Sequence, residues 1–273
     1  MQPDKLGILA GGGLLPRRLI DAARNSGREV FVVGFHGHTD SETLAGIPHL
    51  VTRLGAAGEI IDALKGAGVK QLVMGGHIRR PGMLELRPDW RGAKIAARIG
   101  LTALGDDGLL KAIRRELEAE GFTLLGPQDV LATLLMPAGV LTTAKPSEMA
   151  LSDMNRGIAV LKALAPLDVG QAVIVQQGLV LGIEAIEGTT ALIGRTASLK
   201  REGEGGVLVK FSKAQQDSKL DLPTIGPDTV QQCSAAGLAG LAVEAGRALF
   251  IDQAQAIAAA NKAGLFIIGV ESV

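Results

Sequence analysis

The densest group of side chains that could do chemistry lies between residues 210 and 229. It contains three carboxylates and three lysines: Asp217, Asp221, Asp228, Lys210, Lys213 and Lys219. Carboxylate oxygens are the ligands that Mg²⁺ prefers, and lysine ammonium groups act as point charges on phosphate oxygens. Pro223, Gly226 and Pro227 argue against a simple helix there. The stretch therefore favours a stiffened loop for phosphate and metal chemistry, with a solvated surface loop as the alternative.

A second acidic pair, Glu184 and Glu187, closes an apolar run and leads into a Gly-Thr turn. Residues three apart on an extended chain point to opposite faces, so both can line one site only if the chain turns between them. With Asp217, Asp221 and Asp228 they are the candidate metal ligands. Lys210 and Lys213 are expected to stabilise phosphate charge. Carboxylates and lysines on loops are the groups that metal-assisted phosphoryl chemistry needs.

The first half offers a glycine-rich turn, Gly11, Gly12 and Gly13, between a predicted strand and a predicted helix. Such a turn lets a phosphate approach the backbone, and the helix N-terminus presents unpaired N–H groups to it. Pro16 departs from the dinucleotide fingerprint, and no acidic residue ends the second strand. A nucleotide or sugar-phosphate is therefore favoured over a dinucleotide. The alternative is a tight strand-to-helix connection.

Two further candidates for substrate contact follow in the first half. Arg79 comes just after a predicted strand, at the sheet edge where open parallel sheets bind ligands. His77 lies beside it, although a lone histidine is more often structural. Asp106 could bind sugar hydroxyls, or it could satisfy the first N–H groups of the helix that follows.

The elements that must position these residues indicate an α/β protein of two domains. Short apolar strands alternate with helices up to residue 138, which predicts a Rossmann-like parallel sheet. The expected strands there are 6–10, 29–33, 49–52, 70–74 and 122–125, and the expected helices are 14–25, 56–65, 93–103 and one ending near 120. Residues 139–273 predict a mixed α/β domain. Its expected elements are a helix from Ser147, a hairpin of 171–177 and 179–184 turning at Gly178, strands at 206–211, 238–243, 248–251 and 265–269, and a helix at 252–263.

Composition excludes several classes of function. The 28 basic residues balance 28 acidic ones, Tyr is absent and aromatics are 3%, which argues against a nucleic-acid-binding protein. The one cysteine, Cys233, excludes an intrachain disulfide, fits a reducing cytoplasm and is expected to be a small buried hydrophobe. The sequence has no apolar run of about 18 residues, so it predicts no membrane-spanning helix. A peripheral membrane role stays open.

Several motifs occur in a characteristic order along essentially the whole chain. They include Leu9-Ala-Gly-Gly-Gly-Leu-Leu-Pro16, Leu86-Arg-Pro-Asp89, Gly105-Asp-Asp107, Glu184-Ala-Ile-Glu-Gly-Thr189 and Asp221-Leu-Pro-Thr-Ile-Gly-Pro-Asp-Thr229. This ordered set resembles the UDP-2,3-diacylglucosamine pyrophosphatases of the LpxI type, from lipid A biosynthesis. The chain departs from the family pattern at Thr190, where Asp is expected, and at Ala214, where Pro is expected. The first departure removes one possible metal ligand.

The resemblance implies a reaction and a setting. Water would cleave the pyrophosphate of UDP-2,3-diacylglucosamine at the phosphorus next to the sugar, giving UMP and 2,3-diacylglucosamine 1-phosphate (lipid X). The enzyme would depend on Mg²⁺, with its site between two α/β domains, Asp228 as the essential acidic residue and Thr189 among the substrate contacts.

The enzyme is expected in the cytoplasm, meeting its lipid at the inner membrane surface. A homodimer is compatible with the sequence, which leaves the oligomeric state open. Two other functions remain open: nucleotidyl transfer or another reaction on nucleotide-sugars, and ligand sensing by a non-catalytic protein with two lobes.

Overall fold

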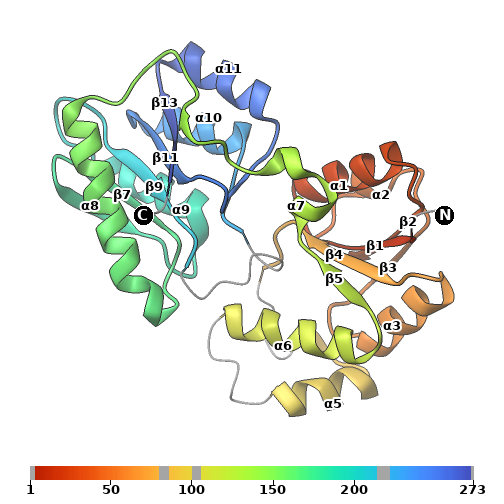
Figure 1. The fold of residues 1–273 in the computed structure, drawn as a ribbon. Helices are drawn as coiled ribbons and strands as arrows, with labels where there is room; N and C mark the ends of the chain where they lie inside the picture. The colour runs from red at the N-terminus through yellow and green to blue at the C-terminus, as the bar shows by residue number, and fades with distance from the viewer. Residues whose placement is uncertain (1–3, 80–85, 100–105, 214–221, 272–273) are drawn as a thin grey trace. The chain divides into compact units, whose positions relative to one another are not determined.

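The chain forms two compact units, Met1–Thr133 and Leu134–Val273, each built around its own sheet (Figure 1). This computed structural model describes residues 4–79, 86–99, 106–213 and 222–271. The α/β class with a parallel sheet followed by a mixed sheet confirms the fold predicted from the sequence. No helix among the described residues is long and apolar enough to cross a membrane.

The N-terminal unit has a five-stranded parallel sheet in the order β3-β2-β1-β4-β5. Its strands are β1 (Leu6–Ala10), β2 (Val30–Phe35), β3 (His49–Thr52), β4 (Gln71–Gly75) and β5 (Thr123–Leu125). Its helices are α1 (Leu14–Asn25), α2 (Ser41–Leu44), α3 (Ala57–Gly66), α5 (Trp90–Ile99), α6 (Asp106–Ala119) and α7 (Pro127–Val130), followed by the 3₁₀ turn η2 (Ala132–Leu134).

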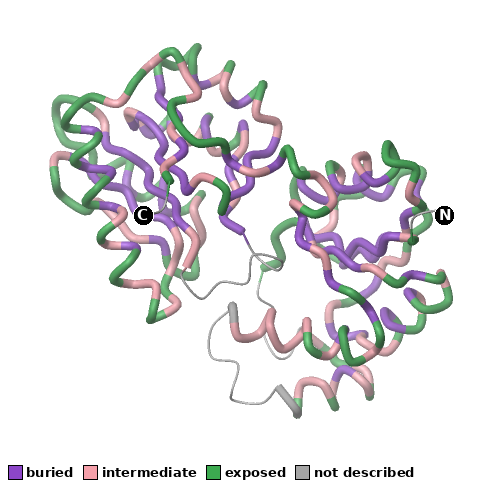
Figure 2. Tube along the Cα trace, in the orientation of Figure 1, coloured by how far each residue is buried: buried purple, intermediate pink, exposed green. Residues whose placement is uncertain are grey.

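Helices cover both faces of this sheet. Helices α1, α2 and α7 lie on one face and α3, α5 and α6 on the other (Figure 1). Every residue of β1 is buried, as expected for a strand covered on both sides (Figure 2). The order of the strands changes direction between β1 and β4, and in open α/β sheets such a point is where ligands bind.

The C-terminal unit has a six-stranded mixed sheet in the order β6-β13-β11-β9-β7-β8. Its strands are β6 (Gly139–Val140), β7 (Ala172–Gln176), β8 (Leu179–Ile183), β9 (Val207–Lys210), β11 (Gly240–Glu244) and β13 (Phe266–Val270), and β10 (Thr224–Ile225) pairs separately with β12 (Leu249–Phe250). Its helices are α8 (Glu148–Leu164), α9 (Gly188–Thr196), α10 (Pro227–Ala235) and α11 (Gln253–Ala263), with 3₁₀ turns η3 (Ala165–Leu167) and η4 (Ala197–Leu199).

The two faces of this second sheet form separate cores. On one face Val173 and Val209 pack against Met154 of α8. On the other face Ile174 and Leu208 pack in the core that includes residues of α9, α10 and α11. Because successive residues of a strand point to opposite faces, each strand supplies both cores.

The predicted hairpin is confirmed, and a buried carboxylate holds it. Gln177 and Gly178 have φ values of 52° and 75° and turn the chain between β7 and β8. Asp153 of α8 is 2% exposed and accepts from the backbone N–H groups of Gln177 at 2.9 Å and Gly178 at 2.6 Å. Ser147 caps α8 as expected, with its Oγ accepting from the Ala150 N–H at 3.0 Å.

One local prediction is wrong. The stretch that includes Asp228 was expected to be loop, yet α10 begins at Pro227 and places Asp228 in its first turn. Proline suits the first position of a helix, because its φ is already helical and its missing N–H has no partner there in any case. Cys233 of the same helix is fully buried as predicted, and burial raises the pKa of its thiol to about 12.

Asp89 caps two helices of the N-terminal unit. Its carboxylate accepts from the Gly58 N–H of α3 at 2.8 Å and from the Gly92 N–H of α5 at 2.6 Å. Partial burial opposes ionisation, but these backbone N–H groups, that of Glu59 and the nearby Arg53 charge together hold the pKa of Asp89 below its ordinary value of 3.8.

We expect Asp89→Ala to lower the free energy of unfolding by about 1–2 kcal/mol at neutral pH, the usual cost of losing such a cap. Because the folded state lowers the pKa, this contribution is complete above pH 3.8 and is lost as the pH falls through the lowered value. Urea unfolding followed by circular dichroism over descending pH measures it. Asp62→Ala, at an exposed ion pair of α3, is the control and should change little. Equal stability of the two variants at neutral pH would contradict the double cap.

Candidate active site

One edge of the C-terminal sheet carries four charged side chains. Strands β9, β11 and β13 are parallel, so their carboxyl ends meet at this edge, and β8 ends there too. The residues at or just beyond these strand ends are Lys210, Glu244, Glu271 and Glu184. This edge is where parallel sheets bind ligands.

Lys210 is the centre of a buried chain of hydrogen bonds. Lys210 is only 5% exposed, and its Nζ donates to Thr189 Oγ1 at 2.9 Å and to the Thr224 carbonyl at 3.1 Å. The Thr189 hydroxyl in turn donates to Glu184 Oε1 at 2.6 Å. Glu184, also 5% exposed, accepts from the Gln171 N–H at 2.9 Å. These hydrogen bonds thus connect the end of β9, the start of α9 and the end of β8.

This chain gives Lys210 a fixed position. A buried charge is costly unless it is paired and hydrogen-bonded, and here the positive Lys210 and negative Glu184 are joined through the Thr189 hydroxyl. The result is an ammonium group held in place before any ligand arrives. The structure therefore brings together Lys210, Thr189 and Glu184, three of the residues proposed from the sequence.

Glu187 does not join this group. It lies on the surface beside Arg195 of α9, with Oε1 3.0 Å from Nη2 and 3.1 Å from Nε. Hydrogen bonding to its own backbone N–H and the Arg195 guanidinium lower the pKa of Glu187, against the effect of partial desolvation. The turn between Glu184 and Glu187 sends one carboxylate inward to Thr189 and the other outward to Arg195.

The remaining candidates of this unit are placed as follows. Asp228 is exposed, and its carboxylate makes no hydrogen bond or ion pair with any described residue. Lys213 Nζ lies 2.6 Å from Asp168 Oδ1, so its charge is partly neutralised. Asp217 and Asp221 lie outside the described residues.

The donors present fit one mode of Mg²⁺ binding. Nowhere in the described residues do three His, Cys, Asp or Glu side chains converge as a metal-binding group. The described residues therefore do not surround a metal ion with protein ligands alone. Mg²⁺ is often held by one or two carboxylates, with waters and substrate phosphates completing the octahedron. The exposed carboxylate of Asp228 suits that second mode.

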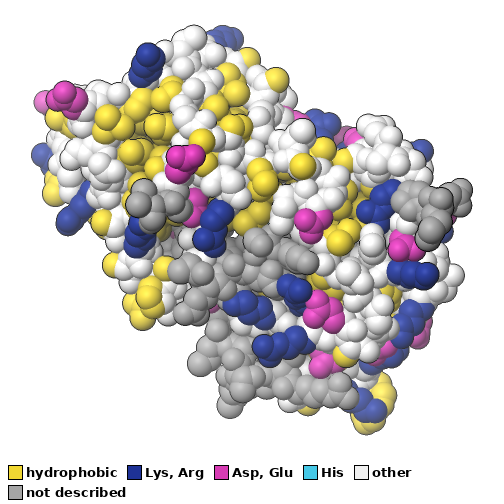
Figure 3. Space-filling view, in the orientation of Figure 1, with side chains coloured by type: hydrophobic (Ala, Val, Ile, Leu, Met, Phe, Trp, Pro, Cys, Tyr) yellow, Lys and Arg dark blue, Asp and Glu magenta, His cyan; other side chains and the backbone are white. Residues whose placement is uncertain are grey.

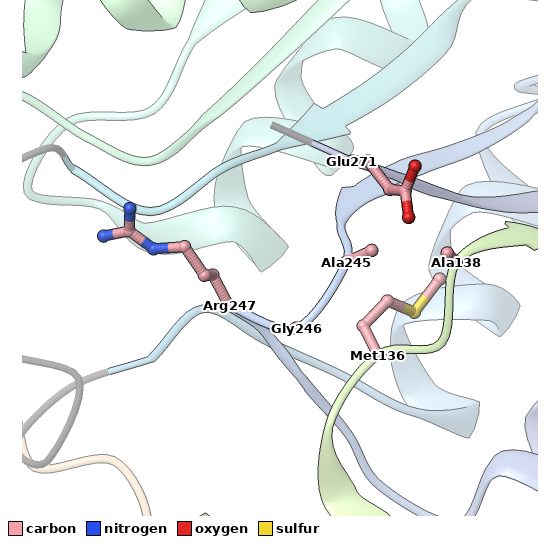
Figure 4. A pocket seen from close by; sticks show the side chains of 6 residues that line it. All are labelled: Met136, Ala138, Ala245, Gly246, Arg247 and Glu271. Atoms are coloured by element: carbon pink, nitrogen blue, oxygen red, sulfur yellow. The ribbon is translucent and has the colours of Figure 1, made fainter. Parts of the chain in front are cut away.

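Sequence reasoning missed a second cluster at the same edge. Glu244 is 4% exposed, and its Oε2 accepts from the Ser212 N–H at 2.8 Å and from the Ser212 hydroxyl at 2.5 Å. Arg247 Nε lies 3.9 Å from the other oxygen of Glu244. A cavity of about 630 Å³ lies alongside, lined by Met136, Ala138, Ala245, Gly246, Arg247 and Glu271 (Figure 4). The only sign of this cluster in the sequence was an acidic residue, Glu244, at the end of an apolar strand.

The backbone N–H groups of the glycine-rich turn in the N-terminal unit are already hydrogen-bonded within the protein. The N–H groups of Gly11 and Gly12 donate to the carbonyls of Gly75 at 2.8 Å and His77 at 2.9 Å. The Gly13 N–H donates to Asp40 Oδ2 at 3.0 Å. A Cβ on Gly11 would lie 2.5 Å from the His77 oxygen, so two loops pack backbone to backbone here. These contacts favour the tight connection over a ready phosphate cradle.

The other two candidates of this unit are less defined. Arg79 is exposed and follows β4 by four residues. Asp106 is the first residue of α6, and its side chain lies outside the described part of the structure.

Comparison with known proteins identifies the family. The model of the LpxI N-terminal domain matches residues 5–134, and that of the LpxI C-terminal domain matches residues 137–268. A relative from Caulobacter vibrioides, named UDP-2,3-diacylglucosamine pyrophosphatase LpxI, is 37% identical over 274 residues, which cover 98% of each chain.

Among solved structures, CobK precorrin-6A reductase matches 99% of this chain and 89% of its own at 12% identity and a TM-score of 0.35. N5-carboxyaminoimidazole synthase from Aspergillus clavatus matches 73% and 44% at 13% identity and a TM-score of 0.28. Scores this low carry no argument. The sequence relationship does, and this chain belongs to the LpxI family.

Proposed function

We propose that this chain is a hydrolase of lipid A biosynthesis that cleaves the pyrophosphate of UDP-2,3-diacylglucosamine to UMP and 2,3-diacylglucosamine 1-phosphate. The name of the Caulobacter vibrioides relative supports the substrate. The observation in the structure that supports the chemistry most is the buried Lys210, held by Thr189 and Thr224 at the edge of the sheet. A fixed ammonium group suits the charge that develops on phosphate oxygens during cleavage.

The proposed reaction needs a nucleophile and a place for its proton. The oxygen of water bonds to the phosphorus next to the sugar, the bond from that phosphorus to the bridging oxygen breaks, and UMP leaves with that oxygen. Asp228 orients the water or takes its proton, since its carboxylate is exposed and uncommitted within the described residues. When bound, Mg²⁺ would neutralise pyrophosphate charge, and Asp228 is the residue that we propose to hold it. Lys213, whose charge Asp168 partly neutralises, is the second cation that we propose for the phosphates.

Apolar residues beside this site suit a lipid. Leu167 is 68% exposed and Val169 is 38% exposed, on either side of the Asp168 that binds Lys213. Ile186, between Glu184 and Glu187, is 92% exposed. Hydrophobic side chains also gather on the face of this unit seen in Figure 3. We propose that such residues meet the acyl chains, with the protein attached peripherally to the inner membrane.

The reaction can be tested by isotope labelling. The protein is incubated with UDP-2,3-diacylglucosamine and Mg²⁺ in H₂¹⁸O, and both products are analysed by mass spectrometry. We expect UMP without label and 2,3-diacylglucosamine 1-phosphate with one ¹⁸O. Label in UMP would place the attack on the other phosphorus. A nucleoside triphosphate formed when pyrophosphate is added would instead indicate nucleotidyl transfer.

A further inference from the structure

Helix α5 has one exposed face, and this face carries the only tryptophan of the chain. Trp90 is 78% exposed, and Lys94 and Ala97 are exposed as well. Because an α-helix has 3.6 residues per turn, these three positions fall on one side of α5. The helix lies at the periphery of the N-terminal unit (Figure 1). We propose that this α5 face binds the surface of an anionic phospholipid bilayer, an inference that rests on the proposed function.

The opposite side of α5 is fixed to the rest of the N-terminal unit. Gly92 is buried, and a Cβ there would clash with the Gly55 carbonyl oxygen, so the two backbones pack closely. The Asp89 carboxylate accepts from N–H groups of both α3 and α5. Arg91 Nη2 donates to Glu120 Oε1 at 2.7 Å. These contacts hold the α5 face outward in one orientation.

The charge of this segment is complementary to an anionic surface. Between residues 86 and 99 one residue is acidic, Asp89, and the basic residues are Arg87, Arg91, Lys94 and Arg98. Asp89 caps two helices, and Arg91 is paired with carboxylates. Arg87 and Lys94 are exposed, and neither makes a salt bridge with a described residue. Each such cation near an anionic membrane adds to the attraction.

Trp90 and Lys94 form one group on this face. Lys94 Nζ lies 5.0 Å from the centroid of the Trp90 ring, a cation–π contact. A tryptophan ring prefers the headgroup level of a bilayer, where its apolar body and its N–H can both be satisfied. An ammonium group beside it meets the lipid phosphates as a point charge. The pair therefore has the chemistry of an interfacial anchor.

A bilayer fits the α5 face better than a protein partner does. A stable protein interface buries about 800 Å² on each partner around an apolar core, whereas the other exposed residues of this face are a lysine and an alanine. An aromatic residue on a basic amphipathic helix is instead typical of helices that lie in the membrane interface. The proposed substrate carries two acyl chains, so the enzyme has to meet it at such a surface.

The single tryptophan makes a direct test possible, because the indole fluorescence of the whole protein reports on Trp90 alone. The full-length protein is titrated with phosphatidylcholine vesicles, with and without phosphatidylglycerol. We expect a blue shift and weaker quenching by acrylamide only with the anionic vesicles, and loss of both effects at about 1 M salt.

Two pairs of variants test the two side chains. Lys94→Gln should raise the lipid concentration for half-maximal binding about fivefold. Its matched control is Lys162→Gln, at an exposed lysine in the last turn of α8, which should bind like the wild type. Trp90→Ala, measured by co-sedimentation with vesicles, should bind about tenfold more weakly or less. Leu179→Ala, at an exposed apolar residue of β8, is its control. Equal binding of either variant and its control, all folded by circular dichroism, would overturn the proposal.

Hydrolysis of substrate dispersed in detergent separates this inference from the proposed function, because such micelles offer no anionic bilayer. A wild-type protein that hydrolyses the dispersed substrate but shows no blue shift with anionic vesicles would overturn the α5 face and leave the hydrolase. Equal shifts with both kinds of vesicle would overturn it too, as would a shift caused by raising the protein concentration alone, which would indicate a second copy on this face. Vesicle binding that depends on Trp90 and Lys94, in a protein without hydrolysis, would support the face and contradict the hydrolase.

Discussion

Asp228→Ala should abolish hydrolysis of UDP-2,3-diacylglucosamine, lowering kcat by at least about 100-fold, the usual contribution of a positioned acid or base. Folding should survive, because the carboxylate makes no hydrogen bond or ion pair with a described residue. Its interaction with the N-terminus of α10 is worth only about 0.3–1 kcal/mol. UMP release gives kcat, and circular dichroism checks the fold.

The control for this variant is Glu148→Ala. Glu148 is likewise an exposed carboxylate in the first turn of a helix, α8. It should keep wild-type turnover. Asp228→Asn, which preserves the size of the side chain, should be nearly as inactive as Asp228→Ala if the charge is what matters. Normal turnover in Asp228→Ala would remove Asp228 from the reaction.

Lys210→Met should lower kcat by about 100-fold or more, the effect of removing one preorganised donor from a site of charge development. Methionine keeps an unbranched apolar stem but removes the ammonium group that donates to Thr189 and Thr224. Steady-state kinetics over a range of substrate concentrations separates kcat from KM. Because the lost charge acts on the transition state, kcat should fall more than KM rises.

The hydroxyl of Thr189 provides an internal check on this prediction. Thr189→Val removes the bridge between Lys210 and Glu184 and should lower kcat, while Thr189→Ser keeps the hydroxyl and should stay near wild type. Glu184→Gln should leave the Mg²⁺ concentration for half-maximal activity unchanged, since Glu184 faces Thr189 and Gln171. A wild-type kcat in folded Lys210→Met would show that the buried ammonium group is only structural.

The strands and the hairpin could be predicted because their signals are local. Buried parallel strands are continuous apolar runs, and Gly178 marks the turn between the two antiparallel strands β7 and β8. The start of α10 was predicted as loop, because proline both breaks helices and begins them. In the structure Gly226 is the N-cap and Pro227 is the first residue of α10, the position that proline tolerates in a helix.

Apart from Thr189, which was named with the family resemblance, the residues that the structure brings together could be predicted because they end strands. Lys210 and Glu184 were found in this way. Their link through Thr189 depends on which strands are neighbours, and the pairing of Ser212 with Glu244 joins residues 32 positions apart. Glu187 was grouped with Glu184 on the condition that the chain turns between them. The chain does turn there, but Glu187 pairs with Arg195, and nothing in the sequence shows that pairing.

The most direct test of the proposed function is UMP release from UDP-2,3-diacylglucosamine by the wild-type protein, with Mg²⁺ and then with excess chelator. We expect steady release with Mg²⁺ and none with chelator, which would establish substrate, reaction class and metal requirement together. Release that persists in chelator would contradict the proposed role of Mg²⁺ at Asp228. No release under either condition, from folded protein that binds the substrate, would contradict the hydrolase and favour a ligand sensor.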